Sequence, residues 1–109
     1  MDRKTLARFE ARAKIMKALA HPTRLFIVEE LSKGERCVCE LTEMIGADVS
    51  TVSKHLSILK SAGLVSDEKR GLWVYYSLKA ACALNFLDCV EAVIRTNLRE
   101  EAGLAGRRR

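Results

Sequence analysis

Two cysteines that are two positions apart, Cys37 and Cys39, are the residues of this sequence best suited to chemistry. Thiolates are soft ligands that select soft or thiophilic ions, although small buried cysteines are also common core residues. Residues i and i+2 lie about 200° apart around an α-helix, whereas they share one face of an extended segment. One ion therefore does not easily bind both sulfur atoms inside an intact helix. We expect a short helix to begin here, with the pair straddling its N-terminus.

The elements that position this pair are mostly helical, because the chain has one Pro, six Gly and long stretches of apolar residues at spacings of three and four. After Gly63 the apolar period changes to two, which predicts one β-hairpin. We therefore predict a mainly α fold with one β-hairpin. The expected helices are 3–20, 23–32, about 37–45, 49–62 and 79–102, and the expected strands are 64–67 and 72–78, joined by a charged turn over 68–71.

A short helix, a turn over 46–48 and a second helix over 49–62 have the spacing of a helix-turn-helix, whose second helix enters the DNA major groove. We expect Val52, Leu56 and Leu59 to face inward, and short hydroxyl groups and one Lys fall on the opposite face. No acidic residue lies between Val49 and Val65. The same pattern also suits a solvated amphipathic helix. The candidate DNA contacts on this helix are Ser50, Thr51, Ser53 and Lys54.

Two basic residues, Lys69 and Arg70, are expected at the tip of the hairpin beside Gly71. A charged tip is often only a solvated turn, but basic side chains there can also reach a phosphate or the minor groove. Together with the helix pair, the hairpin predicts a winged helix-turn-helix.

Composition limits the class of protein. The chain has 109 residues, of which 49% are hydrophobic and 30% charged, which predicts one folded domain and excludes a disordered chain. Three of the five net positive charges lie at 107–109, behind a glycine-containing segment. We expect a DNA-binding and dimerisation domain over 1–102 and a flexible basic tail over 103–109.

The longest uncharged runs are eight residues, far below the roughly 20 that span a bilayer. The charged N-terminal stretch also lacks the apolar core of a secretory signal. We therefore expect no membrane partner and a cytoplasmic location, where the four cysteines are free thiols.

Four motifs occur together in a recognisable order: Ala20–Leu25 (AHPTRL), Glu35–Leu41 (ERCVCEL), Ser50–Leu56 (STVSKHL), and Gly63–Val65 followed by Gly71–Leu78 (GLWVYYSL). They resemble the ArsR/SmtB family of metal-responsive repressors over roughly residues 8–95. The Cys-Val-Cys-Glu-Leu segment is similar to that of arsenical-resistance operon repressors.

This resemblance implies a homodimeric repressor that binds double-stranded operator DNA and leaves it when As(III) or Sb(III), as inducer, binds Cys37 and Cys39. It also implies dimerisation through the first and last helices, whose apolar stripes are the widest in the sequence. We expect binding to distort the turn at the start of the third helix, and no catalytic cofactor is expected.

One departure from the resemblance concerns the third thiolate that As(III) typically takes. Many arsenical repressors have a further cysteine three residues after the pair, where this sequence has Thr42. Cys82 and Cys89 lie seven residues apart on nearly the same helix face, so either is a candidate third ligand, within the protomer or across a dimer. Packing at a dimer interface is the other interpretation of both residues.

Two other interpretations of the cysteines are open. In one, the same cysteines sense Cd(II), Pb(II) or thiol oxidation. In the other, the protein is a thiol enzyme or a metal buffer, which is disfavoured because neither histidine lies beside a cysteine in the sequence.

A zinc site on the last helix is disfavoured because that helix has no His. His21 is expected to cap or pack at a helix junction, and His55 to make a structural hydrogen bond.

Overall fold

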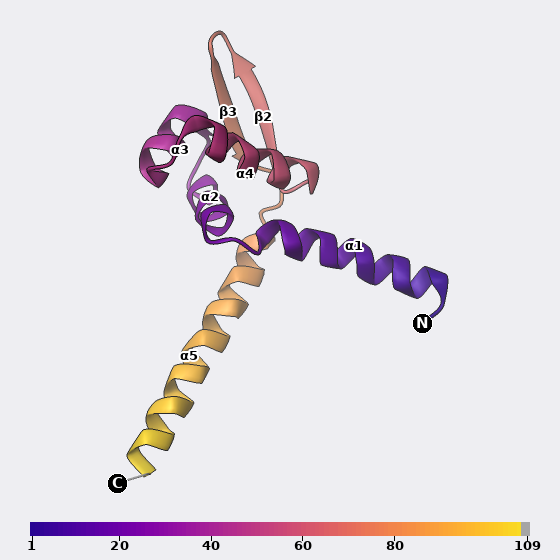
Figure 1. Ribbon diagram of the computed structural model, residues 1–109, viewed down its shortest axis with the longest axis vertical. Coiled ribbons are helices and arrows are strands. Elements are labelled where there is room, and N and C mark those ends of the chain that lie inside the picture. The colour runs from indigo at the N-terminus through magenta and orange to yellow at the C-terminus, as the bar shows by residue number, and fades with distance from the viewer. Residues whose placement is uncertain (108–109) are drawn as a thin grey trace.

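The computed structural model describes residues 1–107, in which five helices and three strands form a winged helix-turn-helix (Figure 1). The predicted mainly α fold class is confirmed. The elements are α1 (Arg3–Leu19), α2 (Pro22–Ser32), β1 (Arg36–Cys37), α3 (Val38–Ile45), α4 (Val49–Ser61), β2 (Val65–Arg70), β3 (Trp73–Leu78) and α5 (Ala83–Arg107).

Helices α2 to α4 begin where local sequence provides a cap. The ring Nδ1 of His21 accepts a hydrogen bond from the Thr23 backbone N–H at 3.0 Å, and Pro22 follows in the first turn of α2. The Asp48 carboxylate accepts from the Thr51 backbone N–H at 2.7 Å and so caps α4. The helix-turn-helix is therefore specified by residues close to each boundary.

The sheet has the strand order β1-β3-β2 and is antiparallel throughout. The charged residues that were expected to form the turn lie instead at the end of β2, where Lys69 pairs with Val74 and Arg70 with Trp73. The turn is shorter than predicted: only Gly71, with φ of +63°, and Leu72 separate the strands. Strand β1 was not predicted, because two residues cannot show a period.

The core lies where α2, α3 and α4 meet the base of the hairpin. Helix α4 contributes three residues with no exposed surface, which are the residues predicted to face inward. The largest fully buried side chains of this core are Ile27, Val28, Leu41, Val52, Leu56, Leu59 and Val65.

Helices α1 and α5 extend away from this core in two directions (Figure 1). Helix α5 begins later than predicted, after a turn over 79–82, and continues through Gly103 to Arg107. The helix end predicted near Ala102 was therefore wrong by five residues, because Ala102, Leu104 and their neighbours favour helix more than Gly103 opposes it. The rest of the predicted tail, Arg108 and Arg109, lies outside the described residues. No helix among the described residues has the length and apolar character needed to cross a membrane.

Candidate DNA interface and cysteine site

Helix α4 presents the predicted polar face to solvent. Ser50, Thr51, Ser53 and Lys54 are all exposed, while the opposite face is buried in the core. The Ser50 hydroxyl donates to the Asp48 carboxylate at 2.9 Å, which places it in the capping network at the start of α4. The fold thus gathers these four candidate contacts on the exposed side of α4.

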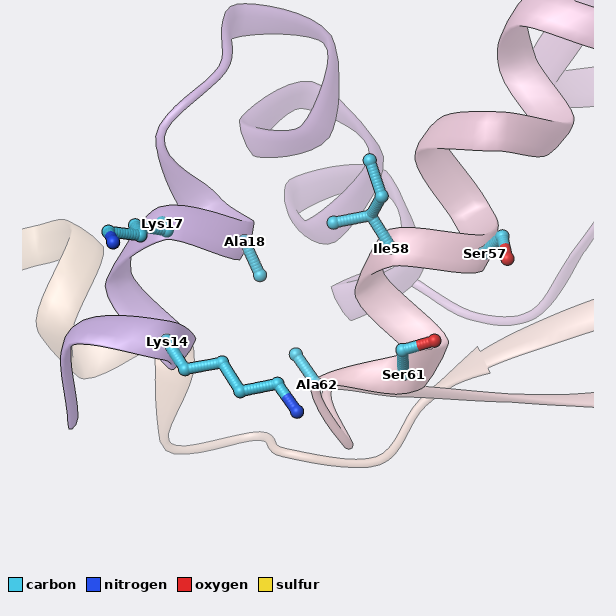
Figure 2. Close-up of a pocket in the computed structure, with 7 residues that line it drawn as sticks. All are labelled: Lys14, Lys17, Ala18, Ser57, Ile58, Ser61 and Ala62. Carbon is cyan, nitrogen blue, oxygen red and sulfur yellow. The ribbon is translucent and has the colours of Figure 1, made fainter. Parts of the chain in front are cut away.

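Two lysines of α1 line a pocket at the C-terminal end of α4, and the sequence analysis did not predict them there. Lys14 and Lys17 of α1 border a pocket with Ser57 and Ser61 of α4, and Figure 2 shows the Lys14 side chain extending toward the end of α4. The sequence contains no local signal for this juxtaposition, because these lysines and serines are 40 or more positions apart in the chain. Lys14 thus adds a positive charge beside the C-terminal end of α4, whereas the Lys17 side chain points away from α4 (Figure 2).

The two basic residues of the wing, Lys69 and Arg70, differ in their ion pairs. Lys69 makes no ion pair within residues 1–107, whereas the Arg70 guanidinium binds Glu35 through two hydrogen bonds of 2.7 and 3.0 Å. Arg70 also contacts Glu68 at 3.0 Å, and its guanidinium carbon lies 4.7 Å from the centre of the Tyr75 ring. Contacts with two carboxylates hold the Arg70 side chain, because β2 continues to this residue and brings it beside Glu35 and Glu68.

The contact between Arg70 and Glu35 raises the pKa of the guanidinium and lowers that of the carboxyl, since each charge stabilises the other. Glu35 directly precedes β1, and β1 includes Cys37. The wing and the cysteine segment are therefore joined by an ion pair as well as by the pairing of Cys37 with Tyr75.

The cysteine pair straddles the start of α3, as predicted. Cys37 has extended backbone angles (φ −80°, ψ 157°) and precedes the first residue of α3, while Cys39 lies in the first turn. Their Cα atoms are 5.4 Å apart, and the side chains meet on one side of the chain. Cys37 is buried and Cys39 is exposed, so the pair is accessible from one direction.

The sulfur atoms of this pair are joined in a disulfide, which corrects the expectation of two free thiols. The physical reason is the extended conformation of Cys37, which directs both side chains to the same side at a Cα separation that suits a disulfide. Metal binding by this pair needs the reduced dithiol.

The candidate third ligands do not complete a site within the protomer. Cys82 lies in the turn before α5, Cys89 lies on α5, and both are exposed free thiols. Within residues 1–107, no three His, Cys, Asp or Glu side chains are grouped so that they could hold one ion.

The histidines make the structural contacts that the sequence predicted. Arg24 lies 3.0 Å from Nδ1 of His55 and donates to the Ala18 carbonyl at 2.7 Å, so it connects the end of α1 to α4. The rings of His21 and His55 lie 4.4 Å apart. Burial lowers the pKa of His55, and the nearby His21 and Arg24 lower it further.

Exposed apolar side chains run along both projecting helices. Leu6, Phe9 and Met16 are exposed on α1. On α5, Val93 and Leu98 each have about 60% of their surface exposed. Such stripes are unusual on the surface of a monomer and indicate a protein interface.

Comparison with known protein sequences gives three findings. A sequence profile described as "Bacterial regulatory protein, arsR family" matches residues 21–67. The chain is 37% identical to the arsenical resistance operon repressor of Escherichia coli K12 over 99 residues, which cover 80% of this chain and 85% of that protein. It is 45% identical to a cadmium resistance regulatory protein CadC homolog of Staphylococcus aureus over 67 residues, or 61% and 55% of the two chains.

Among solved structures, the chain is similar to a homodimeric winged helix-turn-helix DNA-binding domain from Mycobacterium bovis. The TM-score is 0.77 at 30% sequence identity, and the match covers 92% of this chain and 93% of that one.

Proposed function

Since this chain belongs to the arsR family of bacterial regulatory proteins, we propose that it is a homodimeric repressor which As(III) or Sb(III) releases from operator DNA through Cys37 and Cys39. Membership of this family makes it a DNA-binding transcriptional repressor and not an enzyme. The inducer, the contact residues, the dimer and a cytoplasmic location are the parts that we propose.

The observation that carries the proposal is the convergence of two sulfur atoms at the start of α3, the first helix of the helix-turn-helix. Leu41 of α3 packs without exposed surface in the same core as Val52 and Leu56 of α4. A change in the first turn of α3 is therefore transmitted to α4 through packed side chains. The ion induces release because it binds better to the distorted turn than to the turn that suits DNA.

The DNA contacts in this proposal come from two elements. Helix α4 inserts into the major groove and uses Ser50, Thr51, Ser53 and Lys54, while Lys69 of the wing reaches the backbone. Arg70 contributes after exchanging Glu35 and Glu68 for phosphate. A domain over 1–102 carries these functions, and the basic residues of 103–109 add nonspecific attraction to DNA.

The dimer in this proposal forms through the apolar stripes of α1 and α5, as the homodimeric state of the Mycobacterium bovis relative supports. Sedimentation equilibrium is expected to give a dimer for the wild type. Val93→Glu, which places a charge on the α5 stripe, is expected to give monomers that bind operator DNA more weakly. A monomeric wild type would contradict this part of the proposal.

The decisive experiment measures binding to a DNA duplex selected by the protein from a random pool. Reduced wild type and the four single Cys→Ser variants are titrated with As(III), Sb(III), Cd(II), Pb(II) and Zn(II). We expect Cys37→Ser and Cys39→Ser to bind the duplex without the ion and to stay bound at As(III) concentrations that release the wild type. Normal As(III) release of both variants would defeat the proposal, and the Cys82→Ser and Cys89→Ser results identify a third ligand.

A second candidate function, regulation by thiol oxidation at the same residues, is favoured by the disulfide between Cys37 and Cys39. Its test uses the oxidant diamide in place of the metalloid. Release of the duplex by diamide and its recovery with a phosphine reductant, both lost in Cys37→Ser, would support this function, whereas unchanged DNA binding by the oxidised chain would exclude it. The name of the Staphylococcus aureus relative supports including Cd(II) in the same series.

A further inference from the structure

The polar face of α4 continues beyond the contacts proposed above. Ser50 and Lys54 begin a stripe of exposed polar side chains that Ser57 and Ser61 continue to the C-terminal end of the helix. The four positions lie within about 60° of one another around the helix. From Ser50 to Ser61 the stripe is about 16 Å long, whereas the major groove is about 12 Å wide. When the start of α4 lies in the groove, the other end of the stripe therefore meets the sugar-phosphate strand that borders it.

The C-terminal end of α4 is by itself a poor place for a phosphate. A helix C-terminus carries a partial negative charge, which repels an anion. Lys60 lies in the last turn of α4, but its Nζ is 2.9 Å from the carboxylate of Asp67 on β2. A phosphate at this end of α4 therefore needs a cation from another element.

Lys14 of α1 is placed to provide this cation. A pocket of about 260 Å³ lies between α1 and the end of α4, and both Lys14 and Ser61 line it. Among the described residues, no acidic side chain lines this pocket. The Lys14 side chain extends to the end of α4, beside Ala62 (Figure 2). Lys14 is exposed and makes no ion pair within residues 1–107, so its charge is available to a phosphate.

The two projecting helices differ in charge. Within Arg3–Leu19, α1 has six Lys or Arg residues and one Glu, a net charge of +5 that equals that of the whole chain. Within Ala83–Arg107, α5 has three Arg and four acidic residues, a net charge of −1. Positive charge that attracts DNA is thus concentrated on the helix that ends beside α4.

The proposed dimer leaves this side of α1 uncovered. Lys14 lies four positions before Ala18, which is buried in the core, so both residues are on the face of α1 that meets α4. Phe9 and Met16, which belong to the exposed apolar stripe, lie roughly 140–160° away from Lys14 around the helix. A partner that packs on the apolar stripe therefore does not occupy the side of α1 where Lys14 lies.

We propose that Lys14 binds a phosphate of the DNA strand that passes the C-terminal end of α4, which makes α1 part of the DNA interface. This proposal deepens the proposed function and rests on its placement of α4 in the major groove. The ammonium group donates a charge-assisted hydrogen bond to a phosphate oxygen near Ser61. Such a contact adds affinity for any DNA sequence and fixes the orientation of α4 on the duplex.

The first test measures binding of the reduced full chain to the selected duplex, without inducer, at several salt concentrations. We expect Lys14→Gln to weaken binding about threefold to tenfold and to lower the slope of log affinity against log salt by about one. Lys17→Gln is the matched control, because it removes the same charge from a side chain of α1 that points away from α4 (Figure 2). It should weaken binding by less than about twofold. Lys14→Arg, which keeps the charge, should bind like the wild type.

A second measurement identifies the phosphate and separates a DNA contact from a loss of stability. Ethylation interference should mark one phosphate in each half-site whose modification weakens binding of the wild type but not of Lys14→Gln. A duplex with an uncharged methylphosphonate at that position should bind both proteins equally, because neither complex then has the ion pair. If Lys14→Gln acted only by destabilising the fold, it would weaken binding to the normal and modified duplexes by the same factor, which would contradict the proposal.

The outcomes distinguish failure of this proposal from failure of the proposed α4 contacts. Equal losses for Lys14→Gln and Lys17→Gln, or the same interference pattern for Lys14→Gln and the wild type, would overturn the Lys14 contact. A loss of affinity in Lys54→Ala alongside either result would leave the contacts of α4 in place. Wild-type affinity in both Lys14→Gln and Lys54→Ala would overturn the placement of α4 in the groove as well.

Discussion

Helix α4 and the β2–β3 wing both face the expected DNA surface, but different contacts hold them. Helix α4 is anchored by Val52, Leu56 and Leu59, none of which has exposed surface. The wing is buried only at its base, through Val65 and Tyr76, and every β2 residue after Val65 is exposed. Its outer end is held by the exposed contacts of Arg70.

This difference shows where a signal from the cysteines acts most easily. Moving α4 disrupts a close-packed core, whereas moving the outer wing exchanges exposed ion pairs that contribute little. The wing is also joined to the cysteine segment through Glu35 and β1. The outer wing is therefore the more easily moved of the two elements, and it offers the proposed signal a second path besides the packing of α3 against α4.

The largest expected effect is on the free energy of unfolding, and it tests how firmly α4 is packed in the core. Leu56→Ala on α4 should lower the free energy of unfolding by about 2–5 kcal/mol, because it leaves a cavity in the core. The matched substitution Leu72→Ala at the wing turn should change it by less than about 0.5 kcal/mol. Urea denaturation of both variants measures the contrast, and similar losses would contradict it.

The next effect concerns DNA affinity. Lys54→Ala should weaken binding to the selected duplex roughly tenfold and reduce the slope of log affinity against log salt by about one, because Lys54 makes no ion pair within residues 1–107. Arg70→Ala should cost less, since Arg70 must first leave two carboxylates. Fluorescence anisotropy at several salt concentrations compares them, and a greater loss for Arg70→Ala would reverse the comparison.

A smaller effect on DNA affinity, a gain and not a loss, is expected for Glu35→Gln. Removing this carboxylate leaves Arg70 with Glu68 as its one ion-pair partner within residues 1–107 and makes it easier to transfer to phosphate, so binding to the duplex should strengthen about twofold to fivefold at low salt. Glu91→Gln makes the same change in net charge on α5 and is the control. Equal gains in the two variants would show that net charge alone, and not release of Arg70, is responsible.

The smallest effect is on the pH dependence of stability. Because the pKa of His55 is lowered in the folded state, the unfolded chain binds more protons between that value and about 6.5. The stability contributed by neutral His55 is present above pH 6.5 and is lost as the pH falls through this interval. Thermal melts from pH 8 to pH 5 should show this loss in the wild type and a weaker one in His55→Asn; identical profiles would argue against His55 as its source.

Much of the candidate site was predictable because its signals are local. The cap at Asp48, the inward spacing of Val52, Leu56 and Leu59, and the position of Cys37 before α3 each depend on a few adjacent residues. The pairing of Arg70 with Glu35 was not predictable, because 35 positions separate the two residues and only the hairpin register brings them together. The proximity of Lys14 to Ser61 was missed for the same reason.

By itself, the sequence determined the helix-turn-helix, the polar face of α4 and the convergence of two sulfur atoms at a helix start, because caps and periodicity act within one or two turns. Only the tertiary structure decided that Cys37 and Cys39 border an apolar pocket, that β1 joins them to the wing, and that carboxylates hold one of the two wing cations. These features depend on how β1, α4 and the hairpin pack, and packing brings together residues whose separation along the chain carries no periodic signal.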